Sequence, residues 1–265
     1  MRVFVEGVGI AGPGLHGWEK SRETLAGRQA YRSAPLSLAA SNMLPAAERR
    51  RAGVPVRLAI AAGQEALLTS ARDPALTATV LTSSSGDCEN LHHILETLAT
   101  PERQVSPTRF HNSVHNAVAG YWSIATQCHA ASTSLCCHDA SFAAGLLEAA
   151  SQSVAADAPV ALIAYDHPYP EPLNSVRTIR GEFGMALVLA PQATPRAVAA
   201  IEVEFVAKQT DATLMPDPGL EALRTGVPAA RSLPLLASLA RDSSETIKLE
   251  FVEGTHLRVT LKPCA

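Results

Sequence analysis

The sequence has little charge, few aromatic residues and no long apolar run. Charged residues make up 18% and aromatic residues 5% of the 265 residues, and the formal net charge is -3. A weakly acidic chain has no general attraction to nucleic acids or anionic membranes, so we expect neither as a partner. No run of about 18 apolar residues is present to span a bilayer, and the N-terminus lacks the features of a signal peptide. We therefore expect a soluble, cytoplasmic protein.

Cysteines are few, and their number is odd. The five, at positions 88, 128, 136, 137 and 264, do not have the spacing of a disulfide framework or of paired zinc ligands. Neighbouring strand residues point to opposite faces, so Cys136 and Cys137 cannot converge on one ion without a turn. We expect reduced, buried structural thiols, no bound metal and no cofactor.

Strand-like and helix-like segments alternate along most of the chain. Residues 160–165 form a continuous apolar run, which is typical of a central strand buried on both faces. Further strands are predicted at 3–8, 77–82, 185–189 and 200–207, a Pro-interrupted helical region at 219–240, and a closing hairpin at 246–252 and 256–261. The pattern predicts an α/β fold whose sheet is covered by helices.

Glycines near the N-terminus fit the GxGxxG pattern of dinucleotide-binding turns, at Gly7, Gly9 and Gly12. Such a turn needs a helix that begins at once, and here Pro13 and Gly14 intervene and are expected to break regular structure. The acidic residue expected about 20 positions later is also missing. The match alone is weak, and a nucleotide site stays an alternative.

Several segments resemble β-ketoacyl synthases of the thiolase fold, in matching order and spacing over roughly residues 1–207. They are residues 5–10 with Gly14, 25–28, 106–110, 115–120 with 123–124, 157–162 and 181–189. The resemblance implies a thiolase-like fold with a covered mixed sheet. It also implies a complete N-terminal half, residues 1–166, and a truncated second half, residues 167–265, that ends in a β-hairpin.

Condensation in that family needs a Cys at a strand-to-helix elbow and two His residues from the second half. Counting without gaps from the segments on either side places the elbow at Asp139. A carboxylate there cannot form an acyl thioester, and we expect it to cap the following helix. A slip of two or three residues would place Cys137, or Cys136, at the elbow. After Val206 only His256 remains, and its alternating strand predicts a solvent-facing side chain.

The resemblance therefore implies a chain length factor of the short type that accompanies ketosynthases in aryl polyene pigment pathways. Such a subunit is not an enzyme on its own. It pairs with a full-length ketosynthase, which receives acyl chains from an acyl carrier protein, and it shapes the acyl tunnel at the shared interface. The residues expected at the tunnel and interface are Cys88, Leu91, His92, Leu95, His115, Val118, Trp122, Ser132, Thr133, Ser134 and Leu135.

Within the resemblance, the strand expected at 132–137 would pair with its counterpart across the dimer. Two alternatives stay open beside the chain length factor. One is an active β-ketoacyl-ACP synthase with Cys137 or Cys136 as nucleophile. The other is a purely structural protein that stabilises its partner without altering chain length.

Overall fold

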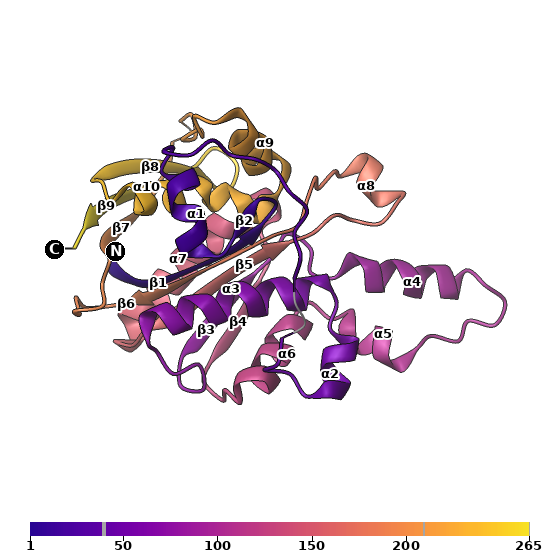
Figure 1. Ribbon diagram of the computed structural model, residues 1–265. Coiled ribbons are helices and arrows are strands. Elements are labelled where there is room, and N and C mark those ends of the chain that lie inside the picture. The colour runs from indigo at the N-terminus through magenta and orange to yellow at the C-terminus, as the bar shows by residue number, and fades with distance from the viewer. Residues whose placement is uncertain (39–40, 209, 265) are drawn as a thin grey trace.

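The computed structural model describes residues 1–38, 41–208 and 210–264, which form a nine-stranded sheet between layers of helices (Figure 1). Its order is β4-β3-β5-β6-β1-β7-β9-β8, and β2 pairs with β1 at one end. The strands are β1 (Arg2–Gly12), β2 (Leu15–His16), β3 (Ala78–Thr82), β4 (Ser132–Leu135), β5 (Val160–Asp166), β6 (Phe183–Ala190), β7 (Ala199–Val206), β8 (Glu245–Glu250) and β9 (His256–Pro263).

The sheet is mixed, as the sequence predicted. β3 runs parallel to both β4 and β5, and the other pairings are antiparallel. Every residue of β5 and β6 is buried, which confirms the central strand read from the unbroken apolar run. β6 lies between β5 and β1, so the sheet joins strands from both sides of residue 166.

Helices cover both faces of the sheet and enclose two hydrophobic cores. One core lies under α3 (Val54–Ser70) and α6 (Ala117–Thr126). The other lies under α1 (Trp18–Leu25), α7 (Ser141–Ala156) and α10 (Leu233–Arg241). The remaining helices are α2 (Ala46–Arg51), α4 (Cys88–Leu98), α5 (Pro107–Asn112), η1 (His138–Ala140), α8 (Leu173–Val176), α9 (Pro218–Gly226) and η2 (Pro228–Ser232).

The N-terminal glycines serve packing and do not form a phosphate-binding turn. The strand predicted at 3–8 is too short, because β1 continues to Gly12. A Cβ on Gly7 or Gly9 would lie 2.0 Å from a carbonyl oxygen of α3, at Ala66 and Ala62 respectively. The glycines therefore let α3 lie directly on the strand, and the GxGxxG match has this structural cause.

A projecting arm, defined here as residues 88–112, carries α4 and α5 away from the body of the molecule (Figure 1). Asp87 caps α4 by accepting a hydrogen bond from the backbone N–H of Asn90 at 3.1 Å. Large apolar side chains along the arm are exposed, among them Leu95 and Phe110. Across the described residues, no helix has the length and apolar character needed to cross a membrane.

Candidate functional site

The elbow between β4 and α7 is built by one strained residue and one serine. The chain turns at His138, which has a φ of 50°, and passes through η1 into α7. The hydroxyl of Ser141 donates to the carbonyl of His138 at 2.7 Å and accepts from the backbone N–H of Cys137 at 3.0 Å. β4 ends at Leu135, so the expectation that strand 132–137 holds Cys136 and Cys137 is wrong.

Asp139 lies at this elbow and faces two arginines. Arg177, just after α8, donates from Nη2 to Oδ1 of Asp139 at 2.5 Å. Arg231, in η2, donates from Nη2 to Oδ2 at 3.1 Å. The expectation that Asp139 caps α7 is therefore wrong, because the residue at the cap position is Ala140 and it makes no side-chain capping bond. The reason is that hydrogen bonds from a charged guanidinium to a carboxylate are stronger than those from the backbone amides of a helix start.

The electrostatics keep Asp139 ionised. Partial burial favours the neutral acid, but the hydrogen bond from Arg177 and the charge of Arg231 outweigh it and lower the pKa of the Asp139 carboxyl. Arg231 also forms an ion pair with Glu250, at the end of β8. The elbow that the resemblance aligned with a nucleophile is thus occupied by an anion, and its ion pairs continue through Arg231 and Glu250 to Arg224.

The two neighbouring thiols are not the buried structural cysteines that the sequence predicted. Cys136 is exposed, and its Sγ donates to the carbonyl of Ser84 at 2.8 Å. Cys137 is half-buried, and desolvation raises the pKa of its thiol. A raised pKa reduces the thiolate fraction at neutral pH, which is the opposite of what a nucleophile requires. The burial prediction holds for Cys88 and Cys128.

A buried carboxylate joins three loops beside the elbow. Asp166, at the end of β5, accepts hydrogen bonds from the Ser83 hydroxyl at 3.0 Å, the Ser84 backbone at 2.8 Å and the Ala229 backbone at 2.8 Å. Complete burial raises its pKa to about 6, although these hydrogen bonds act to lower it. Sequence reasoning missed this residue, although an acid at the end of an apolar run was a signal that it is buried and paired.

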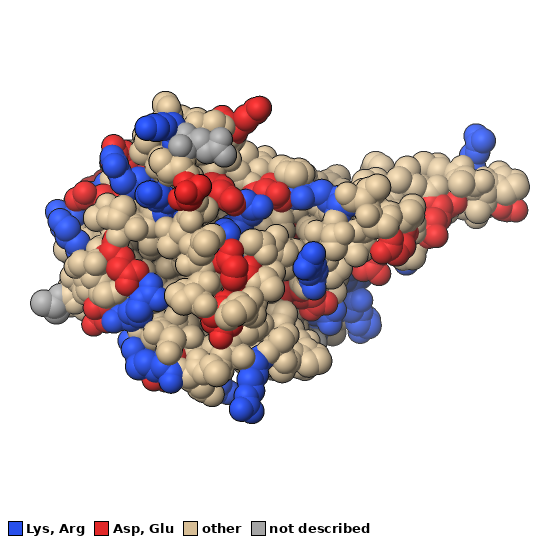
Figure 2. All heavy atoms as spheres, turned by 90° about the horizontal axis from the view of Figure 1, so that it is seen from above, with Lys and Arg blue, Asp and Glu red and all other residues tan. Residues whose placement is uncertain are grey.

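Four of the expected tunnel residues do come together, in an apolar groove between α4 and α8. The groove has a volume of about 530 Å³. It is lined by Cys88, Leu91, His92 and Leu95 from α4 and by Pro170, Pro172, Leu173, Ser175 and Val176 around α8. In the space-filling view this part of the molecule is mostly uncharged, with acidic side chains along one edge (Figure 2). The sequence analysis did not predict the residues around α8 as part of the tunnel, because no motif or periodic pattern marks them.

The other expected tunnel residues lie elsewhere. Val118 and Trp122 belong to the core under α3, where the Trp122 ring would meet a Cβ on Gly63 at 2.6 Å. His115 lines a shallow cleft between α6 and the open edge of β4, together with Ser132 and Ser134.

The two remaining residues expected at the interface are on β4. The hydroxyl of Thr133 accepts a hydrogen bond from the amide of Gln152 at 2.8 Å. Leu135 packs against the core under α7. The edge strand itself has no neighbouring strand beyond it within the described residues, so its outer hydrogen-bonding groups are available to a partner.

His256 is buried, which corrects its predicted exposure. Its side chain is 4% exposed, and Nδ1 pairs with the backbone carbonyl of Lys208. The face expected to be solvent-exposed is open at Arg258 but closed at His256, the first residue of β9, where the chain after β7 supplies the Lys208 carbonyl. His256 is therefore a structural residue of β9.

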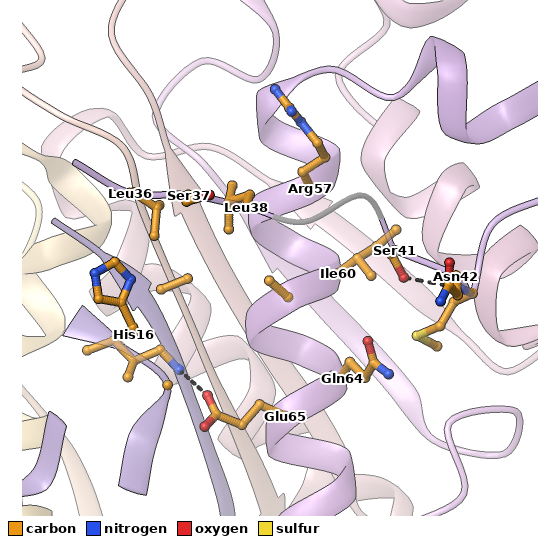
Figure 3. A pocket seen from close by; sticks show the side chains of 15 residues that line it. His16, Leu36, Ser37, Leu38, Ser41, Asn42, Arg57, Ile60, Gln64 and Glu65 are labelled. Carbon is orange, nitrogen blue, oxygen red and sulfur yellow. Dashed lines mark hydrogen bonds between the residues drawn. The ribbon is translucent and has the colours of Figure 1, made fainter. Parts of the chain in front are cut away.

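A second cavity, of about 710 Å³, lies between α3 and the segment that crosses it (Figure 3). Glu65 points toward it, but both oxygens of its carboxylate already accept hydrogen bonds, from the backbone N–H groups of Ile10 at 2.9 Å and Trp18 at 2.5 Å. Burial raises the pKa of Glu65. These contacts join α3 to β1 and α1, which makes Glu65 a structural anchor.

Over the part of the chain that the structure covers, no three His, Cys, Asp or Glu residues cluster as metal ligands do.

Comparison with known families places these features in context. The family model of the β-ketoacyl synthase N-terminal domain matches residues 17–245. No curated protein sequence matches the chain.

Solved structures share the fold over nearly the whole chain. One is a complex of the ketosynthase ApeO with its chain length factor ApeC from Xenorhabdus doucetiae, with a TM-score of 0.72, 22% identity, and coverage of 98% of this chain and 99% of that chain. The ishigamide ketosynthase/chain length factor gives a TM-score of 0.76 at 15% identity and covers both chains fully. A complex of a type II PKS acyl-carrier protein with its ketosynthase bound to the hexaketide, AntDE:AntF, gives 0.73 at 14% identity, with 99% of each chain covered.

Proposed function

Because this chain belongs to the β-ketoacyl synthase family and has its thiolase-like fold, we propose that it acts as a non-catalytic chain length factor. In this role it pairs with an active ketosynthase and shapes the tunnel in which the partner's acyl chain grows. The observation that carries the proposal is Asp139, an ionised carboxylate tied to two arginines at the elbow between β4 and α7. Counting along the sequence aligned this elbow with the nucleophile of the family. A carboxylate in that state cannot carry an acyl thioester.

The alternative of a self-sufficient synthase has less support. Cys137 has a raised thiol pKa, and the Sγ of Cys136 is directed to a backbone carbonyl rather than to the start of α7. His256, the one His after Val206 in the sequence, is buried in β9. These residues do not form the set of one Cys and two His that the condensation requires.

The groove between α4 and α8 is the feature suited to a growing acyl chain. Its lining is apolar, and one acyl chain displaces water from such a surface at a gain of about 0.8 kcal/mol per CH₂. Leu91 and Leu95 are 46% and 56% exposed in the free chain. A bound partner, or the acyl chain of its substrate, would bury these side chains. We place the ketosynthase against this arm and the open edge of β4, with the acyl chain in the groove.

The biochemical setting follows from the same proposal. The partner is a full-length ketosynthase that supplies the nucleophile and both histidines and receives its substrates from an acyl carrier protein. Solved complexes that resemble this chain include a ketosynthase with its chain length factor and a ketosynthase with an acyl-carrier protein. We propose a cytoplasmic heterodimer in an aryl polyene pathway.

The test is reconstitution of the chain with its ketosynthase and measurement of product length. Leu91→Ala and Leu95→Ala remove bulk from the groove and should lengthen the products by one or more extension steps. Leu98→Ala is the matched control, because Leu98 is also on α4 and equally exposed, at 46%, but lies outside the groove. Failure to form a complex, or one product distribution for all three variants, contradicts the proposed function.

A further inference from the structure

We propose that Asp139 is a positioning residue that sets the width of the groove by holding α8 through Arg177. The inference rests on the proposed function and deepens it. The position that serves as nucleophile in the active family members has here become an anchor for the movable wall of the acyl groove. The Asp139 carboxylate is joined to that wall by the 2.5 Å hydrogen bond from Arg177.

The segment that carries α8 is fixed at its two ends. It leaves the sheet at Asp166 and returns at Phe183. On the first side, Tyr169 is buried and its hydroxyl lies 3.2 Å from the Ser84 hydroxyl. On the second side, Ile179 is buried in the core and the N–H of Arg180 donates to the Gly226 carbonyl at 2.9 Å.

Between these ends the segment has few ties to the rest of the protein. Leu173 and Val176 are 41% and 82% exposed. The hydrogen bonds of Asn174 and Ser175 remain within the segment. For residues 170–178, the Arg177–Asp139 pair is the one hydrogen bond or ion pair that reaches another helix or strand in the described chain.

The other end of the anchor is firmly held. Asp139 lies in the elbow that Ser141 braces, and its second oxygen is bound by Arg231 of η2. Arg231 in turn pairs with Glu250 at the end of β8. Asp139 therefore connects a loosely tied segment to the start of α7 and to η2, both of which are largely buried.

The groove depends on this connection because its two walls differ in rigidity. The α4 wall belongs to a capped helix of 11 residues, whereas the α8 wall is a single helical turn of four residues. A short turn has little intrinsic stability and takes its position from tertiary contacts. Loss of the Arg177 contact frees the α8 wall to move outward, which widens the groove and admits longer chains.

The experiment compares Asp139→Asn, Arg177→Gln and the double variant by hydrogen exchange and by product length. Each single variant should raise the exchange rate of residues 173–178 in the purified chain by about 1.5-fold to fivefold, the range for losing one partly exposed ion pair. The double variant should change little further, because both substitutions break one contact. In the complex with the ketosynthase, all three should shift products toward longer chains.

Two controls separate this role from general weakening of the fold. Arg177→Lys keeps the cation and should retain the parent product length. Glu23→Gln breaks a remote surface pair with Arg28, joined at 2.7 Å, and should change neither readout. Unchanged exchange and products in Asp139→Asn overturn the inference. If Leu91→Ala still lengthens products, the proposed function stands without it; if no groove variant does, the proposed function itself fails.

Discussion

Asp166 should make the protein less stable as the pH rises from 4 to 6, the reverse of an ordinary paired aspartate. Its pKa is raised from 3.8 to about 6 by complete burial. The folded protein therefore keeps a proton that the unfolded chain releases in this range. The stabilising contribution is fully present below about pH 4 and is lost as the pH passes 6. A rise of this size corresponds to about 3 kcal/mol.

Urea unfolding of the parent chain and Asp166→Asn, from pH 4 to pH 7.5, measures this contribution. The asparagine does not titrate, so the parent's free energy of unfolding should fall by about 2.5 kcal/mol relative to the variant over that range, since part of the full contribution is already lost at pH 4. The neighbouring His167 has a pKa lowered by burial, and the charges acting on it come from Asp87, Glu89 and Glu182. His167 is present in both proteins, so the difference between the two curves reports mainly on Asp166.

Asp139→Asn provides a control of opposite sign. The pKa of Asp139 is lowered, so its contribution is present above the unfolded-state pKa and is lost in acid. The parent should gain stability over this variant as the pH rises through about 4. A flat difference curve for Asp166→Asn would show that folding does not raise the pKa of this carboxyl, and a curve that rises with pH would show that folding lowers it. Either result would refute the reasoning.

Two further predictions concern packing and the thiols. Gly9→Ala places a Cβ 2.0 Å from the Ala62 carbonyl oxygen, and urea unfolding should show a loss of about 3 kcal/mol or more. Gly120→Ala, whose Cβ meets nothing within 4 Å, should change stability by less than about 1 kcal/mol; equal losses would mean that α3 can move away from β1. With iodoacetamide, Cys136 should be alkylated before the buried Cys88 and Cys128. Intact mass after incubation with acyl carrier substrate should show no acyl adduct, and an adduct on Cys137 or Cys136 would restore the active-synthase alternative.

Much of the fold follows from the residue pattern alone. The central strand was predicted because residues 160–165 of the buried β5 form an unbroken apolar run, and the closing hairpin because Glu253 and Gly254 interrupt two alternating strands. Errors arose where packing overrides a local signal. Gly9 resembles a strand breaker, yet its missing side chain is what allows α3 to approach β1.

The candidate site was predictable in position but not in contacts. The elbow at Asp139 could be located by counting along the chain, since the distances to flanking segments are fixed. Its partners Arg177 and Arg231 are 38 and 92 residues away, and no local pattern links them. A lone carboxylate before a helix was accordingly interpreted as a cap, whereas two distant cations determine its role.

The place of β1 in the sheet has a consequence for how the chain is made. β1 begins at residue 2, but its partners β6 and β7 end at residues 190 and 206. During synthesis on the ribosome, β1 cannot pair with β6 and β7 until most of the chain has been made. Such long-range pairing is slow, and until it forms the apolar residues of β1 remain exposed and prone to aggregation. We therefore expect the nascent chain to depend on chaperones, and a fragment ending at residue 166 to aggregate when expressed alone.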